Sequence, residues 1–148
     1  MRAVVQRVHN AVLTVDNKEI SRIEHGLLVM VGVVNTDDVE QTKKLAYRIA
    51  TTRVFKDEND KLNKNVSDVG GSVMLVSNFT LCATKKGGTR PDFSISADKT
   101  KALELYLKVK DILIEEYKIN TVLGAFAEHM HVNANLDGPI TLFFDMGE

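Results

Sequence analysis

Hydroxyl side chains near the middle of the chain are the first candidates for chemistry. Ser77 and Thr80 lie in the run Ser77-Asn78-Phe79-Thr80-Leu81, and the chain also holds four histidines and twenty acidic residues. Hydrolytic triads need a nucleophile, a base and an orienting group, and all three residue types are present. No Gly-x-Ser-x-Gly motif surrounds a serine. The residue types alone therefore favour a structural role, in which both hydroxyls satisfy backbone groups at a strand end.

A second candidate is the pair of histidines in His129-Met130-His131. In a strand, residues i and i+2 lie on one face, where two imidazoles could share a metal ion. No third ligand lies near them in the sequence. We therefore expect solvent-exposed strand histidines, and a metal-dependent hydrolase remains the alternative.

Basic residues gather in the loop that follows Leu81. Lys85, Lys86 and Arg90 stand there beside two glycines and Pro91. Such a patch can contact a phosphate backbone without specifying a base sequence. Because the loop begins where the run from Ser77 ends, we expect these three residues to bind nucleic acid next to the site.

Gly138-Pro139 is the last local motif. A glycine followed by a proline ordinarily marks a turn, and only about 5% of X-Pro bonds in folded proteins are cis. From sequence physics alone, this bond is expected to be trans, with the strand interrupted at Asp137-Gly138-Pro139.

The elements that must position these residues begin with short β-branched stretches. These cover residues 3–8, 11–15 and 19–23, and the polar pairs His9-Asn10 and Asp16-Asn17 separate them. Both pairs favour tight turns, so the pattern predicts an antiparallel meander. Near the other end of the chain, residues 140–144 again favour a strand.

Two continuous apolar stretches, residues 27–34 and 72–76, predict strands that are covered on both faces. We expect the first of them to be the central strand. Residues 54–55 favour a further short strand, and residues 56–71 are polar and turn-rich, which predicts an ordered surface excursion.

Two helices are expected between the strands. One begins at a cap formed by Asp37 or Asp38 and runs to about Thr52, and the other follows Asp98 with apolar residues at helical spacing as far as Tyr117. Strands on both sides of two helices predict an α/β fold in a single domain of residues 1–148, in which mixed, largely antiparallel sheets are layered with two main helices.

Composition narrows the function classes. Nineteen basic and twenty acidic residues give a net charge of −1, so any contact with nucleic acid must be local. A single cysteine, Cys82, excludes an intramolecular disulfide and suits the cytoplasm. The longest apolar run is too short to cross a bilayer, and the N-terminus is unlike a signal peptide, so no membrane partner is expected.

Six ordered segments together resemble one family, the D-aminoacyl-tRNA deacylases, also called D-tyrosyl-tRNA deacylases. The resemblance spans nearly the whole chain. The matching segments are residues 1–8, Gly70-Gly71-Ser72, residues 77–81, 88–93 and 124–130, and residues 137–141. It implies the D-tyrosyl-tRNA deacylase-like fold and a reaction in which the ester between a D-amino acid and its tRNA is hydrolysed without cofactor or metal.

The resemblance also implies a homodimer, because in this family the Gly-Pro motif of one subunit enters the pocket of its partner. Gly138-Pro139 would then be cis and would leave room at the substrate's α-carbon only for the hydrogen of a D-residue. Phe126 and Met130 would line the adenosine pocket, and Arg7 would support the site from the first strand.

The same resemblance places catalysis at Ser77, Asn78, Phe79 and Thr80. Backbone N–H groups of Phe79 and Thr80 would stabilise the oxyanion, worth about 3 kcal/mol each where water is excluded. Thr80 has been regarded as a nucleophile in the family, but we interpret it as a positioning residue. The partner at this site would be the aminoacylated 3′ end of tRNA, and glycine is a further candidate substrate.

Two positions depart from the family pattern. Asn78 stands where glutamine is usual, and Leu136 stands where asparagine is usual. A related class with asparagine at the first position has relaxed specificity and accepts L-alanine, so such a deacylase is an alternative. A non-catalytic, nucleic-acid-binding relative of the same fold is another.

Overall fold

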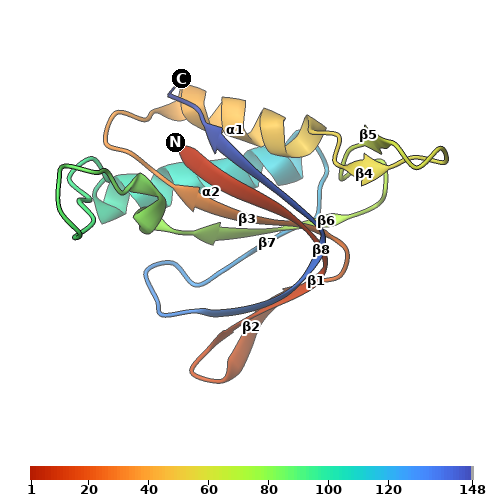
Figure 1. Ribbon diagram of the computed structural model, residues 1–148, viewed down its shortest axis with the longest axis horizontal. Coiled ribbons are helices and arrows are strands. Elements are labelled where there is room, and N and C mark those ends of the chain that lie inside the picture. The colour runs from red at the N-terminus through yellow and green to blue at the C-terminus, as the bar shows by residue number, and fades with distance from the viewer. Residues whose placement is uncertain (148) are drawn as a thin grey trace.

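One sheet organises the chain, and the computed structural model describes residues 1–147 of it (Figure 1). Its strands lie in the order β2-β1-β3-β6-β7, and β8 pairs with β1. β3, β6 and β7 run parallel to one another, whereas all pairings of β1 are antiparallel, so the predicted mixed sheet is confirmed. The strands are β1 (Arg2–Val15), β2 (Lys18–Ile23), β3 (Gly26–Gly32), β6 (Ser72–Ser77), β7 (Thr121–Leu123) and β8 (His131–Asp145).

The central strands β3 and β6 are buried on both faces, which explains their unbroken apolar sequences. Leu27 and Leu75 point into the core beneath the two helices. Leu28 and Met74, one position away, point into a second core on the opposite face, which β1 and β2 help to enclose. Each strand therefore lacks a polar, solvent-facing side.

Two helices cover one face of this sheet, α1 (Val39–Thr51) and α2 (Lys99–Glu115) (Figure 1). The Asp38 side chain accepts from the backbone N–H of Glu40 at 2.8 Å, and Asp98 accepts from that of Lys101 at 2.9 Å. Both caps and both helices agree with the prediction. No helix in the described part of the chain is long and apolar enough to cross a membrane.

Two expected breaks were wrong. His9-Asn10 does not form a turn, because β1 runs through it; the strand instead shifts its register against β8 on either side of Val8. Asp137-Gly138-Pro139 does not end a strand either, since β8 continues from His131 to Asp145. In both places pairing between β1 and β8 over their full length outweighs the local turn preference. The Asp16-Asn17 turn is confirmed, with both residues at positive φ.

The polar segment after α1 is ordered, as expected. It forms a hairpin of two short strands, β4 (Phe55–Lys56) and β5 (Leu62–Lys64). The carboxylate of Asp57 accepts from the backbone N–H groups of Asn59 at 2.8 Å and Lys61 at 3.1 Å. These hydrogen bonds lower the pKa of Asp57 and fix the hairpin loop.

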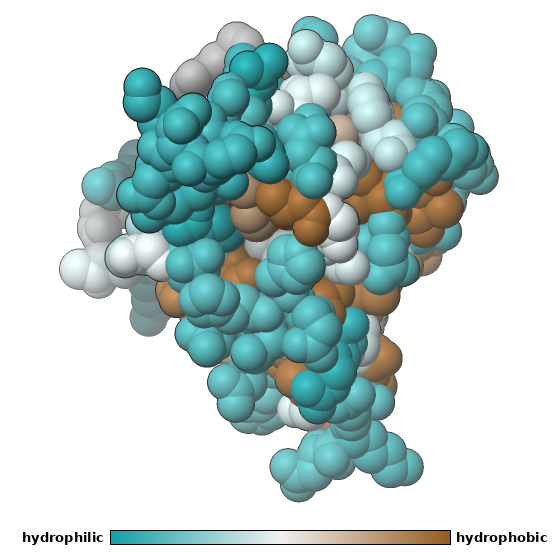
Figure 2. Space-filling view, turned by 90° about the vertical axis from the view of Figure 1, so that its right-hand side faces the viewer, coloured by the Kyte–Doolittle hydropathy of each residue, from teal (hydrophilic) through white to brown (hydrophobic). Residues whose placement is uncertain are grey.

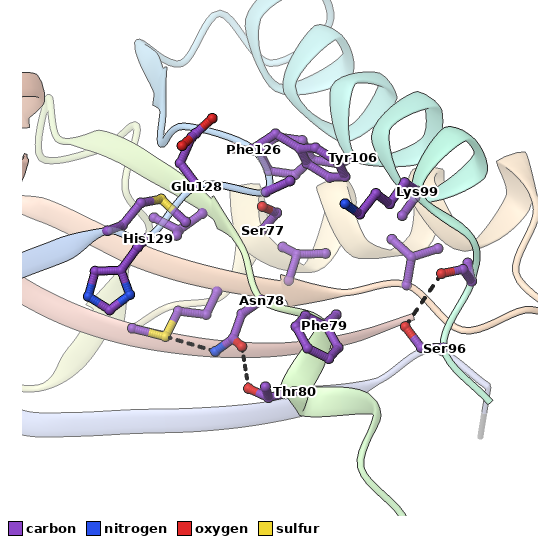
Figure 3. Close-up of a pocket in the computed structure, with 18 of the residues that line it drawn as sticks. Ser77, Asn78, Phe79, Thr80, Ser96, Lys99, Tyr106, Phe126, Glu128 and His129 are labelled. Atoms are coloured by element: carbon purple, nitrogen blue, oxygen red, sulfur yellow. Dashed lines mark hydrogen bonds between the residues drawn. The ribbon is translucent and has the colours of Figure 1, made fainter. Parts of the chain in front are cut away.

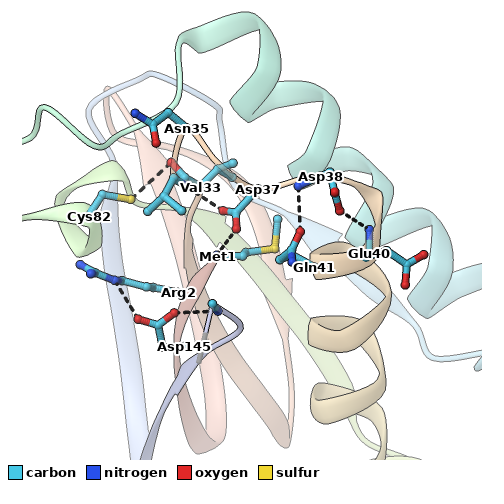
Figure 4. A network of polar contacts seen from close by, with 12 residues as sticks. Met1, Arg2, Val33, Asn35, Asp37, Asp38, Glu40, Gln41, Cys82 and Asp145 are labelled. Carbon is cyan, nitrogen blue, oxygen red and sulfur yellow. Dashed lines mark hydrogen bonds and ion pairs between the residues drawn. The ribbon is translucent and has the colours of Figure 1, made fainter.

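A polar network joins the two ends of the chain to the segment that follows β6 (Figure 4). Arg2 donates to Asp145 at 3.2 Å and to the carbonyl of Leu81 at 3.0 Å. The thiol of Cys82 donates to the carbonyl of Val33 at 3.4 Å, and burial raises its pKa, so it stays protonated. The buried carboxylate of Asp37 forms an ion pair with the amino group of Met1. The network thus fixes the backbone beyond the end of β6.

Candidate active site

A cavity of about 720 Å³ opens where β6 ends, between that strand end, the first turns of α2 and the segment before β8 (Figure 3). This volume is in the range of small-molecule sites, roughly 300–1,000 Å³. Six of the residues predicted from the sequence line it, namely Ser77, Asn78, Phe79, Thr80, Phe126 and Met130.

The strand end offers free hydrogen-bond donors. The backbone N–H of Asn78 donates to the carbonyl of Val31 at 2.7 Å, and the short 3-10 helix η1 (Phe79–Cys82) begins immediately after it. The N–H groups of Phe79 and Thr80 are the first of that helix, and among residues 1–147 neither has an acceptor. They can therefore donate to an oxygen atom in the cavity.

The side chains of the same motif form a small network. The hydroxyl of Thr80 donates to the Oδ1 atom of Asn78, and the Asn78 amide donates to the sulfur of Met30 at 3.6 Å (Figure 3). The Thr80 proton is thus directed to an amide oxygen, which is not a general base. This contact agrees with a positioning role for Thr80.

Aromatic side chains form the wall opposite the strand end. Tyr106 on α2 packs against Phe126 with ring centroids 5.9 Å apart. The Tyr106 hydroxyl donates to the carbonyl of Leu75 at 2.6 Å, and burial raises its pKa well above the ordinary value. Tyr106 therefore stays neutral, and together with Phe126 it supplies a flat apolar surface.

Both histidines are exposed, as expected, but only one is in a strand. His131 begins β8, whereas His129 precedes that strand and lines the cavity. Their ring centroids are 5.1 Å apart, in an edge-to-face arrangement. Residues 1–147 contain no group of three or more His, Cys, Asp or Glu side chains that could hold a metal ion.

Arg7, Gly138 and Pro139 lie outside the cavity of their own chain. Arg7 is buried, and its guanidinium contacts the Asp137 carboxylate at 3.1 Å and the Val54 carbonyl at 2.7 Å. It thus anchors the residue before Gly138. The Gly138-Pro139 bond is cis, as the resemblance implies and contrary to the general preference for trans.

The basic loop is exposed, and its three cations differ in environment. Lys86 contacts Asp92 at 3.3 Å and Ser94 at 2.9 Å, whereas Lys85 and Arg90 form no ion pair within the described chain. Hydrogen bonds from Ser94 and Thr84, with Lys86 nearby, lower the pKa of Asp92 to about 2. Phe79 packs edge-on against Phe93 at 5.1 Å, which ties this loop to the cavity.

Some residues of the cavity escaped prediction. Lys99, Ala102 and Tyr106 all line it, and their spacing places them on one face of the predicted helix. The sequence predicts this helix from its apolar spacing and assigns no site role to that face. Gly32 does not line the cavity but lies against the segment that follows β6, since a Cβ atom there would lie 2.9 Å from the Cys82 sulfur and 3.0 Å from the carbonyl oxygen of Asn78. No local signal in the sequence marks this contact, because it joins β3 to η1.

Comparison with known proteins gives concordant matches. The family described as D-Tyr-tRNA(Tyr) deacylase matches residues 4–145. The D-aminoacyl-tRNA deacylase of Caldicellulosiruptor bescii is 41% identical over 98% of this chain and 97% of its own. That of Desulforudis audaxviator is 45% identical with the same coverage. These relatives are similar over essentially the full length of both chains.

Two solved structures have the same fold. The c-Myc DNA Unwinding Element Binding Protein has a TM-score of 0.93 at 33% identity, covering 98% of each chain. A probable eukaryotic D-amino acid tRNA deacylase has a TM-score of 0.81 over 97% of each chain, and at 15% identity it shows the fold alone. With the family match over almost every residue, the chain belongs to the D-Tyr-tRNA(Tyr) deacylase family.

Proposed function

We propose that the chain hydrolyses the ester bond between a D-amino acid and the 3′ end of its tRNA, in the cytoplasm. One observation supports this above the others: a cavity of small-molecule size with two unpaired N–H groups, those of Phe79 and Thr80, at the strand end. The relatives at 41% and 45% identity are named for the same activity.

The proposed hydrolysis requires no catalytic side chain. An aminoacyl ester is already activated, so water directed by the terminal ribose 2′-hydroxyl attacks the carbonyl carbon. The N–H groups of Phe79 and Thr80 stabilise the resulting oxyanion, each by about 3 kcal/mol in a dry site. The bond to the ribose oxygen then breaks, that oxygen takes a proton, and the free D-amino acid leaves. Phe126 and Met130 hold the adenosine.

The proposal includes a homodimer whose active sites lie at the subunit interface. Gly138 and Pro139 are exposed at the bend of β1 and β8 and do not line the cavity of their own chain. Figure 2, viewed from the side of that bend, shows apolar surface among polar side chains. Leu136 and Phe143 on β8 are 44% and 60% exposed, which suits a strand that packs against a second copy.

An assay with matched substrates tests the function. Purified protein is mixed with D-tyrosyl-tRNA and L-tyrosyl-tRNA, and the loss of each ester is followed against a protein-free control. We expect only the D-ester to be cleaved faster than its spontaneous rate. Equal cleavage of both esters would leave a relaxed deacylase, the alternative that Asn78 and Leu136 suggest. Parallel assays with glycyl-tRNA and L-alanyl-tRNA would show which further esters such a relaxed deacylase cleaves. Cleavage of none would reject the function.

Replacing Thr80 by alanine should leave deacylation within about tenfold of the wild type. The variant loses one hydrogen bond, to Asn78, worth about 1 kcal/mol, while the backbone donors remain. Single-turnover hydrolysis of D-tyrosyl-tRNA measures this, with Thr80→Ser as the control that keeps a hydroxyl. If Thr80 were the nucleophile, the alanine variant alone would lose several orders of magnitude.

The basic loop is proposed to contact tRNA phosphates near the acceptor end. Replacing both Lys85 and Arg90 by glutamine should weaken binding to all tRNAs alike and reduce the slope of log affinity against log salt by about 1.5. Lys86→Gln should have a smaller effect, because Asp92 already neutralises Lys86. Filter binding across a salt series measures the slopes, and an effect confined to one tRNA species would contradict the proposal.

A further inference from the structure

We propose that Lys99 binds the phosphate on the 5′ side of the substrate's terminal adenosine, so that the cavity prefers esters of nucleotides to esters of nucleosides. The inference rests on the proposed function and identifies which part of the tRNA the site itself recognises. Among residues 1–147, Lys99 is the only lysine or arginine that lines the cavity.

Lys99 lines the cavity from α2, whereas the ester would be held at the end of β6. Lys99, Ala102 and Tyr106 follow one face of α2, and Figure 3 shows the Lys99 side chain extending from that helix into the cavity. Lys99 lies seven residues before Tyr106, or about 10 Å along the helix axis. A base stacked beside Tyr106 and Phe126 would therefore direct its own ribose phosphate towards Lys99.

The ammonium group of Lys99 is also available. The ion pairs of lysine side chains in the described part of the chain involve Lys43, Lys56, Lys64, Lys86 and Lys110, but not Lys99. The neighbouring Lys101 is engaged with the carbonyl of Asn35. Lys99 is solvent-exposed and lines a cavity that holds one carboxylate, that of Glu128, and whose other walls are mainly apolar. A cation so placed favours an anionic ligand group.

Phosphate is the anion that all substrates of this reaction share. The α-amino group of an aminoacyl ester is positive and the adenine is neutral, whereas every phosphodiester carries a full negative charge. The amino-acid side chain is negative only in aspartyl and glutamyl esters. An ammonium–phosphate hydrogen bond is charge-assisted and hence among the stronger ones in a protein. The phosphate contact would thus serve every substrate equally.

Two small esters that differ by one phosphate test this inference. They are adenosine and adenosine 5′-monophosphate, each carrying D-tyrosine as an ester on the ribose 3′ oxygen. We expect the wild type to cleave the phosphorylated ester with about tenfold higher kcat/KM. Lys99→Met should lower kcat/KM for the phosphorylated ester about tenfold and so remove that preference. Lys108→Met, an exposed lysine of the same helix outside the cavity, should keep the preference.

Other outcomes overturn the inference in distinguishable ways. An unchanged preference in Lys99→Met, or an equal loss on both esters, would show that Lys99 does not bind the phosphate. With D-aspartyl esters of the same two carriers tested in parallel, a loss found only on those esters would show that Lys99 recognises the amino-acid side chain. If the wild type cleaves neither of these esters nor D-tyrosyl-tRNA, the proposed function fails. Calorimetric binding of adenosine 5′-monophosphate against adenosine, to wild type and Lys99→Met, still decides whether Lys99 binds phosphate.

Discussion

Gly138→Ala is expected to reduce deacylation about a hundredfold or more while the chain stays folded. Gly138 has a φ of +122°, a region that side-chain-bearing residues rarely adopt, and a Cβ atom there would lie 3.0 Å from the backbone nitrogen of Ile140. The backbone must shift, and a displacement of about 1 Å at a substrate-positioning group can reduce a rate a hundredfold. Because Gly138 is exposed, the loss of stability should be only about 1–3 kcal/mol.

The control for this variant is Gly70→Ala. Gly70 also has positive φ, but a Cβ atom there would meet nothing within 4 Å, and Gly70 does not line the cavity. Hydrolysis of D-tyrosyl-tRNA, thermal unfolding and sedimentation are measured for both variants. Gly138→Ala should sediment as a dimer, fold and lack activity, whereas Gly70→Ala should keep activity. If Gly138→Ala stays within a few-fold of wild type, Gly138 does not shape the substrate pocket.

Local signals predicted the helices and the central strands. Asp38 and Asp98 cap α1 and α2 as expected, because a cap is a contact between residues two or three positions apart. The continuous apolar sequence of β3 likewise predicted burial on both faces, which the two cores confirm. These features depend on neighbours along the chain, which a single sequence displays.

The continuity of the two longest strands could not be predicted in this way. His9-Asn10 and Gly138-Pro139 favour turns locally, yet β1 and β8 continue through these two pairs of residues. They do so because the two strands pair with each other although more than a hundred residues of sequence separate them. The functional site could not be predicted from local signals either. From the residue types alone, Ser77 and Thr80 are predicted to have structural roles, and only the family resemblance identified them as site residues. Lys99 escaped because its place in the cavity depends on how α2 packs beside β6.

Gly26→Ala should have the largest effect on stability, about 3 kcal/mol or more, which corresponds to a Tm lower by on the order of 10 °C. A Cβ atom on Gly26 would lie 1.9 Å from the backbone oxygen of Ser72 and 2.7 Å from its nitrogen. Both are backbone atoms of the strand that pairs with β3, and Gly26 opposite Ser72 is the first pair of that parallel ladder. No rotamer change can relieve the clash, so the strands must separate.

Alanine variants of two nearby glycines, Gly71 and Gly70, test whether the effect at Gly26 comes from this clash. At Gly71 a Cβ atom would lie 3.0 Å from the Val66 side chain and 3.3 Å from both the Gly26 Cα atom and the His25 carbonyl oxygen, and at Gly70 it would meet nothing within 4 Å. The midpoint of unfolding by denaturant should therefore be far lower for Gly26→Ala than for Gly71→Ala or Gly70→Ala. Equal midpoints for the three variants would contradict the clash.

The same ladder sets Ser77 opposite Val31 at the mouth of the cavity. Any Gly26→Ala protein that remains folded should therefore lose activity beyond its unfolded fraction, because a displaced β6 moves the N–H groups of Phe79 and Thr80 away from the ester.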